Sequence, residues 1–156
     1  MFIIKNILLP TDFSELSLTA ADYAIDLAIQ YGAKVHMLNI LEKTPPILTI
    51  RSLDLSEEKI IQSIKNDAIS NLESSVAKVR KGKDVSIQPV IRNGIDYQEI
   101  VKYSKDEKID VIVIATHGRT GILHTLLGSV AEKVIRFAKC PVLVITPPEI
   151  DDEQKT

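Results

Sequence analysis

The sequence predicts one doubly wound α/β domain, in which a parallel sheet is covered by helices on both faces. Short runs that are apolar at nearly every position and rich in β-branched residues predict the strands, because such strands are buried on both faces. Helical patterns separate these runs, and this alternation indicates right-handed crossovers within one sheet. The clearest apolar runs are residues 7–9, 35–41, 111–115 and 142–145.

The first helix is expected between the strands at 7–9 and 35–41. Apolar residues recur there every three or four positions, from Ala20 to Tyr31. Gly32 follows directly, and glycine is the residue that most often ends a helix.

A longer apolar stripe, from Ile61 to Val79, predicts a second helix that ends before Gly82. We interpret this stripe as a core face and not as a groove for a partner. A weaker strand pattern follows at 85–91 and contains Pro89. Proline cannot donate to a ladder of hydrogen bonds, so this run is expected at the edge of the sheet.

Two capping-box patterns predict the starts of the last two helices. Asp96 with Glu99 is the first, and Ser129 with Glu132 is the second. We find no internal repeat, and we expect one domain over residues 1–148. A long loop is predicted at 43–54, and an acidic, mobile tail at 149–156.

Composition excludes several classes of protein. The 156 residues are 45% hydrophobic and 26% charged, which is ordinary for a globular domain. The formal net charge of −2 argues against a dedicated nucleic-acid binder. Cys140 is the single cysteine, so no internal disulfide forms, and this fits a reducing compartment. With no apolar run near the ~18 residues of a membrane span and no signal peptide, we expect a cytoplasmic protein.

A ligand of such a sheet is expected beyond the carboxyl ends of the strands, where the strand order reverses. The loop that begins at Pro10 and the loop that begins at Thr116 follow two candidate neighbours, the strands at 7–9 and 111–115. Gly128 and Ser129 open the last helix, whose unpaired N–H groups form an anion site. The Ser129 hydroxyl either caps this helix or contacts a phosphate. The sequence has neither a P-loop nor a dinucleotide fingerprint.

Asp12 and His117 each have a functional and a structural interpretation. Asp12 either accepts a hydrogen bond from a ribose hydroxyl, or helps to hold a metal, or caps the first helix. If Ser14 is the cap, Asp12 is left for a ligand. His117 either holds its loop near the phosphates or acts as a base or metal ligand, but no second ligand stands at a suitable spacing.

Four segments together resemble the universal stress protein family along essentially the whole chain. They are ILLPTDFS (7–14), IATHGRTG (114–121), LLGSVAEKV (126–134) and CPVLV (140–144). The resemblance implies a Rossmann-like, five-stranded parallel sheet in the order 3-2-1-4-5. This order places the strand with Pro89 at one edge, as the sequence pattern also predicts.

The ATP-binding branch of this family carries a glycine, two residues, a second glycine, nine residues, and then glycine with Ser or Thr. Gly118, Gly128 and Ser129 match that pattern, whereas Ala115 stands in place of the first glycine. A methyl group at Ala115 is expected to crowd the ribose, so ATP binding is expected to be weakened but not abolished.

The resemblance implies an ATP site in which Asp12 contacts the ribose and Mg or Mn bridges phosphate oxygens without direct protein ligands. No catalytic residue is predicted. The residues expected around the nucleotide are Pro10, Thr11, Asp12, Ile40, Ala115, His117, Gly118, Arg119, Gly128, Ser129 and Val130.

The resemblance also implies a homodimer that pairs the last strand, Val142, Leu143, Val144 and Ile145, with its twofold mate. No charged residue protects that strand, although Pro147 and the tail offer an alternative cover. The expected function is that of an ATP-binding sensor or switch in the stress response. The alternatives are a dimeric scaffold that binds no nucleotide and a slow ATP hydrolase.

Overall fold

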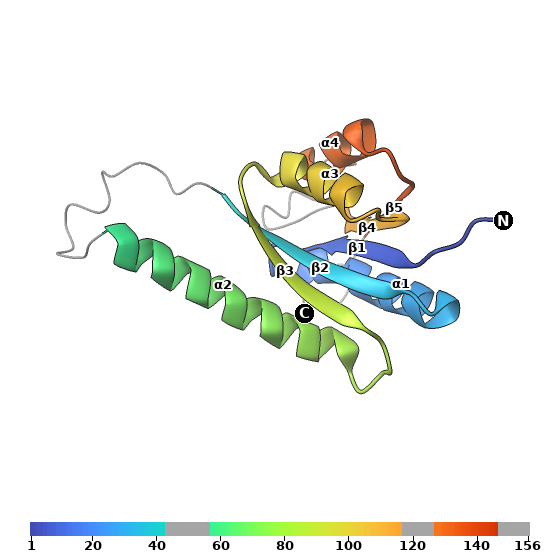
Figure 1. The fold of residues 1–156 in the computed structure, drawn as a ribbon, viewed down its shortest axis with the longest axis horizontal. Helices are drawn as coiled ribbons and strands as arrows, with labels where there is room; N and C mark the ends of the chain where they lie inside the picture. The colour runs from blue at the N-terminus through green and yellow to red at the C-terminus, as the bar shows by residue number, and fades with distance from the viewer. Residues whose placement is uncertain (43–56, 117–126, 147–156) are drawn as a thin grey trace, which may run out of the picture.

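The computed structural model describes residues 1–42, 57–116 and 127–146. These residues form a five-stranded parallel sheet in the order β3-β2-β1-β4-β5, with four helices (Figure 1). This confirms the predicted fold class and the strand order that the resemblance implied. The strands are β1 (Asn6–Pro10), β2 (Lys34–Leu41), β3 (Ile87–Asn93), β4 (Val111–Ala115) and β5 (Val142–Ile145); the helices are α1 (Glu15–Tyr31), α2 (Glu57–Arg80), α3 (Asp96–Asp106) and α4 (Ser129–Phe137).

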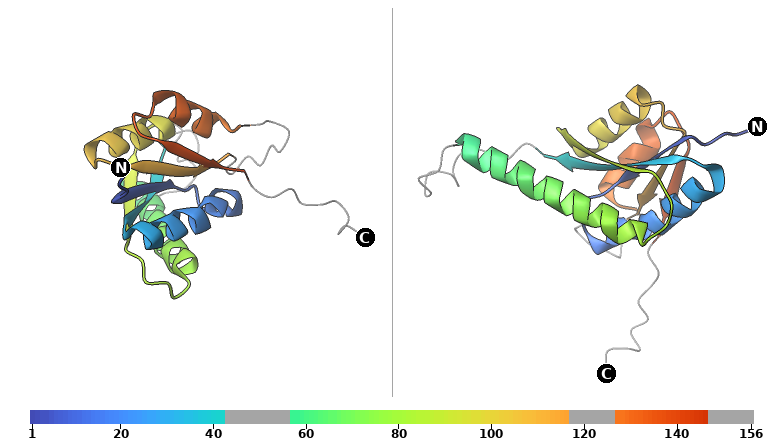
Figure 2. Two further views of the ribbon diagram at one scale, coloured as in Figure 1. Left: turned by 90° about the vertical axis from the view of Figure 1, so that its right-hand side faces the viewer. Right: turned by 60° about the horizontal axis from the view of Figure 1, so that its bottom comes forward.

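The sheet lies between two helical layers, with α1 and α2 on one face and α3 and α4 on the other (Figure 2). Side chains alternate between the two faces along each strand. In β1, Ile7 and Leu9 join the core cluster under α1 and α2, and Leu8 joins the cluster under α3 and α4. Both clusters need apolar residues, which explains why the central strands are apolar at every position.

The strand predictions were accurate for β4 and β5, whose bounds match the apolar runs. β1 and β2 are each longer than the apolar runs that predicted them. The predicted loop at 43–54, the predicted division at residue 148 and the acidic tail lie outside the described residues. In the described part of the chain, no helix is long and apolar enough to cross a membrane.

Pro89 stands in an edge strand, as predicted, and costs the ladder no hydrogen bond. The N–H of Val35 in β2 donates to the carbonyl of Ser86 (2.9 Å). Bonding groups alternate along a strand, so the even-numbered residues of β3 face β2. Pro89 is odd-numbered, so the side of its backbone that lacks an N–H faces the open edge of the sheet.

The predicted end of α1 is confirmed, the choice between its two candidate caps is decided, and the predicted capping box at the start of α3 is wrong. Ser14 caps α1, and Gly32 ends it with a left-handed backbone (φ 63°). At α3 the cap is Ile95, and its side chain makes no capping bond. Asp96 is instead the first helical residue, and its carboxylate accepts the N–H of Tyr97 (2.5 Å). An aspartate is favourable both as a cap and as the first residue of a helix. The spacing of Asp96 and Glu99 therefore placed the start of α3 one residue too late.

The apolar stripe of α2 is a core face along only part of its length. Leu72 and Val79 are buried, but Ile61 is 51% and Ile64 is 37% exposed. Figures 1 and 2 show the reason, because the first turns of α2 extend beyond the strands. A helical period predicts which residues share a face but not how far the sheet beneath that face extends.

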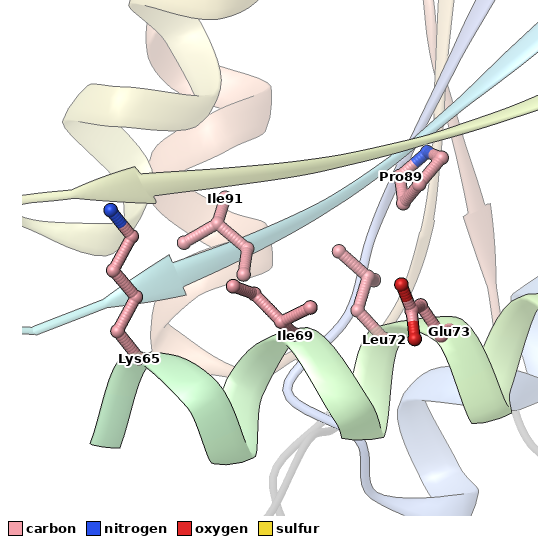
Figure 3. Close-up of a pocket in the computed structure, with 6 residues that line it drawn as sticks. All are labelled: Lys65, Ile69, Leu72, Glu73, Pro89 and Ile91. Atoms are coloured by element: carbon pink, nitrogen blue, oxygen red, sulfur yellow. The ribbon is translucent and has the colours of Figure 1, made fainter. Parts of the chain in front are cut away.

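A shallow groove of about 230 Å³ lies between α2 and β3 (Figure 3). Ile69 and Leu72 of the helix approach Ile91 of the strand, and Lys65 and Glu73 flank them. None of the predicted nucleotide-binding residues lines this groove. The remaining lining residue is Pro89.

A buried histidine ties β1, β2 and α3 together. His36 is 4% exposed, its Nδ1 lies 2.8 Å from the Tyr103 hydroxyl and its Nε2 lies 3.3 Å from Oδ1 of Asn6. Burial lowers the pKa of His36, and the nearby charge of Lys34 lowers it further, while Glu107 opposes both effects.

The lowered pKa of His36 predicts that the protein loses stability as the pH falls. An unfolded histidine has a pKa of about 6.5 and binds a proton before the folded one does, so stability is complete above that pH and declines below it. His36→Gln should cost about 1–2 kcal/mol at pH 7, because it disturbs two hydrogen bonds, but should flatten the decline. Urea unfolding from pH 7 to pH 5 measures both effects.

Tyr103→Phe is the matched control, because it removes the hydroxyl and leaves the titrating imidazole in place. It should keep the steep dependence on pH. Equal slopes for the wild type and His36→Gln would contradict the prediction.

Candidate functional site

The predicted crevice lies where the strand order reverses. β1 pairs with β4 through Ile7 and Val111, and it pairs with β2 on its other side. The carboxyl ends of these parallel strands therefore meet at one edge of the sheet. From that edge the chain continues from β1 into α1 on one face, while β4 precedes α4 on the other face. The pairing of β1 with β4 confirms the expected neighbours. The divergence of the two chains leaves the crevice in which doubly wound folds bind ligands.

The structure assigns the cap of α1 to Ser14 and not to Asp12. The N–H of Ser17 donates to Oγ of Ser14 (3.0 Å). Oδ1 of Asp12 accepts hydrogen bonds from the N–H (3.0 Å) and the hydroxyl (2.5 Å) of Ser14. Asp12 is half-buried, and one oxygen of its carboxylate is held by the cap residue.

A buried polar cluster adjoins Asp12 through its chain neighbour Thr11, and no sequence pattern predicted it. Thr11, Ser17 and Asn39 are between 4% and 7% exposed. Oγ1 of Thr11 lies 3.0 Å from Oγ of Ser17, and Nδ2 of Asn39 donates to the carbonyl of Thr11 (2.9 Å). We call these three residues the Thr11 cluster. The available signal was the presence of polar residues inside or beside otherwise apolar runs.

Phe13 has a left-handed backbone conformation (φ 68°), which is uncommon for a residue other than glycine. Its N–H donates to Oγ1 of Thr11 (3.0 Å), and this bond stabilises the bend. Such strain persists only where the surroundings hold the chain in place. The loop between β1 and α1 is therefore shaped by the Thr11 cluster.

The ladder between β1 and β2 ends at the same place. The N–H of Thr11 donates to the carbonyl of Leu38 (2.9 Å), but the Thr11 carbonyl accepts the side-chain amide of Asn39. In a regular ladder that carbonyl would accept the N–H of Ile40. Ile40 thus lies beyond the last rung, half-buried against the cluster under α3 and α4, where Val130 also packs.

The start of α4 differs from the predicted capping box. The cap is Gly128, whose N–H donates to the carbonyl of Thr116 (2.6 Å), and Ser129 is the first helical residue. No side chain of the described residues caps this helix through a hydrogen bond. The first-turn N–H groups and the positive end of the helix dipole therefore remain suited to an anion at the end of β4.

Ala115 ends β4 with its methyl group in the core cluster under α1 and α2, where it is 6% exposed. Ile40 and Val130 pack on the opposite face of the sheet. Ala115 is not among the residues with a positive φ, so its backbone needs no glycine. The expected crowding of the ribose by this methyl group stays a prediction, and its placement in the core cluster argues against it.

The remaining predicted site residues, His117, Gly118 and Arg119, lie outside the described residues. Among residues 1–42, 57–116 and 127–146, no group of three or more His, Cys, Asp or Glu side chains is placed to hold a metal ion. The structure thus brings together the end of β1, the end of β2 and the start of α4 as the described part of the candidate site.

Comparison with known proteins agrees with this geometry. The model of the universal stress protein family matches residues 4–146. The chain belongs to the universal stress protein family. The universal stress protein MJ0531 of Methanocaldococcus jannaschii is 37% identical over 145 residues, which are 93% of this chain and 84% of the relative.

Solved structures of relatives share the fold. That of MJ0577 from the same organism has a TM-score of 0.75 and 29% identity, and covers 95% of this chain and 99% of that one. A universal stress protein in complex with cAMP has a TM-score of 0.70 and 22% identity, and covers 91% and 97% of the two chains. The second likeness supports the fold alone.

Proposed function

We propose that this universal stress protein is an ATP-binding, homodimeric sensor or switch in the stress response. One observation carries the nucleotide proposal. Within the described residues the helix α4 starts at Gly128 without a side-chain cap, at the same sheet edge where the carboxylate of Asp12 is held. The N–H groups of a helix start suit phosphates, and a carboxylate suits a ribose hydroxyl. A nucleotide carries both a phosphate and a ribose hydroxyl, and this match supports the proposal.

Relatives support the class of ligand. Universal stress proteins of the same fold have been solved with cAMP and with dAMP. We propose ATP with Mg or Mn for this chain, because the glycine pattern resembles that of the ATP-binding branch. The nucleotide would contact Pro10, Thr11, Asp12, Ile40, Ala115, Gly128, Ser129 and Val130, together with His117, Gly118 and Arg119.

We propose that binding, and not turnover, is the function. The chemistry that the described residues supply at this site is backbone N–H groups, a carboxylate held by Ser14 and an apolar wall at Ile40. These groups bind and orient a nucleotide, whereas phosphoryl transfer also needs an oriented water and a stabilised leaving group. Slow hydrolysis and a scaffold role without nucleotide are the alternatives that turnover and binding assays separate.

The dimer proposal concerns β5. This strand forms the edge of the sheet beside β4, and Leu143 is 38% exposed. Val142 and Val144 are half-buried, so the edge carries apolar side chains on both faces. An apolar edge strand is an aggregation hazard unless another strand covers it. Pairing with the β5 of a second copy would cover it.

Mg-ATP should raise the melting temperature of the protein. Ligand at 100 times its dissociation constant adds about 2.7 kcal/mol to the free energy of unfolding, which corresponds to roughly 5–11 °C for a domain of this size. Asp12→Ala should remove most of this shift, and Asp67→Ala, an exposed carboxylate on α2, should keep it. No shift in wild-type protein shown to be free of nucleotide would refute ATP binding.

Ala115→Gly should change the dissociation constant of ATP less than twofold, because the methyl group points into the core under α1 and α2. The same substitution should cost about 1–2 kcal/mol of stability, through the lost buried methyl and the added backbone freedom. Calorimetric titration and urea unfolding measure the two effects. A gain of tenfold or more in ATP affinity would mean that the methyl crowds the nucleotide.

Leu143→Asp should convert the dimer into a monomer, because it places a charge on the apolar edge of β5. Ile69→Asp is the matched control, since Ile69 is 39% exposed but lies on α2, which packs on β3 at the opposite edge of the sheet. Sedimentation velocity distinguishes the two masses. A wild-type protein that sediments as a monomer would exclude the dimer.

A further inference from the structure

We propose that the Thr11 cluster, Thr11 with Ser17 and Asn39, positions the Asp12 carboxylate and thereby sets the preference of the site for ribonucleotides over deoxyribonucleotides. The inference rests on the proposed nucleotide function and adds a specificity to it. Thr11 and Ser17 act through Asp12, and Asn39 acts through Thr11, so all three are positioning residues that need no contact with the ligand.

The direction of each hydrogen bond can be assigned, because a hydroxyl has one proton. The Ser17 hydroxyl donates to the carbonyl of Ser14 (2.9 Å), so in the 3.0 Å contact between Ser17 and Thr11 the donor is Thr11. Oγ1 of Thr11 in turn accepts the N–H of Phe13 (3.0 Å). One chain of bonds therefore runs from Phe13 through Thr11 and Ser17 to Ser14.

A second chain leaves the same serine and ends on the carboxylate. The N–H of Ser17 donates to Oγ of Ser14 (3.0 Å), and the Ser14 hydroxyl donates to Oδ1 of Asp12 (2.5 Å). Ser17 thus holds the residues on both sides of Asp12, namely Thr11 before it and Ser14 after it. Both bonds from Ser14 reach the same carboxylate oxygen, so the cap residue fixes the direction of the Asp12 side chain.

Asn39 anchors this arrangement to β2. Its Nδ2 donates to the Thr11 carbonyl (2.9 Å), while its buried Oδ1 has no hydrogen-bond partner among the described residues. A buried acceptor without a partner is destabilising, so an apolar side chain would serve stability better at this position. We therefore explain the asparagine at position 39 by its hydrogen bond to the carbonyl of Thr11, the residue before Asp12.

The backbone of Phe13 also links the Thr11 hydroxyl to the orientation of Asp12. Phe13 keeps a left-handed backbone between two anchored residues, and this conformation turns the chain from β1 into α1. Without the Thr11 hydroxyl, the N–H of Phe13 loses its acceptor and the loop gains access to ordinary backbone conformations. Asp12 would then point in several directions, and a ribose hydroxyl would lose its fixed acceptor.

The experiment compares the affinity of ATP with that of its 2′-deoxy and 3′-deoxy analogues by calorimetric titration. A hydrogen bond to a charged group predicts about tenfold weaker binding of one deoxy analogue to the wild type. That ratio should fall to about twofold in Thr11→Val and in Ser17→Ala, and to about one in Asp12→Ala. Thr11→Ser, which restores the hydroxyl, should recover the wild-type ratio.

Thr19→Val is the matched control. Thr19 lies on α1, as Ser17 does, and its hydroxyl donates to the Leu16 carbonyl (2.7 Å) outside the Thr11 cluster. Loss of this hydroxyl should leave the ratio of ATP to deoxy-analogue affinity unchanged. Thermal unfolding confirms that each variant is folded. If Ser17→Ala does not fold, Thr11→Val and Thr11→Ser remain a complete test.

The ratio separates positioning from general destabilisation. If Thr11→Val weakens ATP and the deoxy analogue equally, or if the wild type binds both equally, the positioning role is wrong while nucleotide binding stands. If the wild type binds no ATP, both the proposed function and this inference are overturned.

Discussion

The pairing of β1 with two neighbours, β2 on one side and β4 on the other, organises both the core and the candidate site. Its residues Ile7, Leu8 and Leu9 are completely buried, so both core clusters are built around this strand. The same pairing makes β1 the point of strand reversal. Chains that leave a reversal cover opposite faces of the sheet, and the crevice between them is a consequence of topology before any side chain is considered.

Two helices start at that crevice and satisfy their first N–H groups in different ways. In α1 the Ser14 side chain accepts one of them, and the Ser14 hydroxyl donates to Asp12. In α4 the cap is Gly128, which has no side chain to offer. One helix start thus orients a carboxylate and the other presents N–H donors, and this pairing of an acceptor with donors is what suits the two ends of a nucleotide.

The expectations that the structure corrected concern helix ends and helix burial, and they share a cause. The patterns at Asp96 and Ser129 predicted helix starts correctly to within one residue, but both residues are the first residue of the helix and not the cap. The apolar period of α2 was correct, yet Ile61 is exposed because the sheet does not extend beneath it. A local pattern indicates which helix ends and which buried face a segment can form, and packing against neighbouring elements determines which of these it adopts.

The elements, the parallel sheet, the edge position of Pro89 and the family could all be predicted from the amino-acid sequence, because they depend on periodicity, on missing donors and on motifs within short stretches. The hydrogen-bonded cluster of Thr11, Ser17 and Asn39, and the direction of the Ala115 methyl toward α1 and α2, could not be predicted in this way. Residues on β1, α1 and β2 meet only after the strands pair in register, and the face to which a side chain points follows from that register.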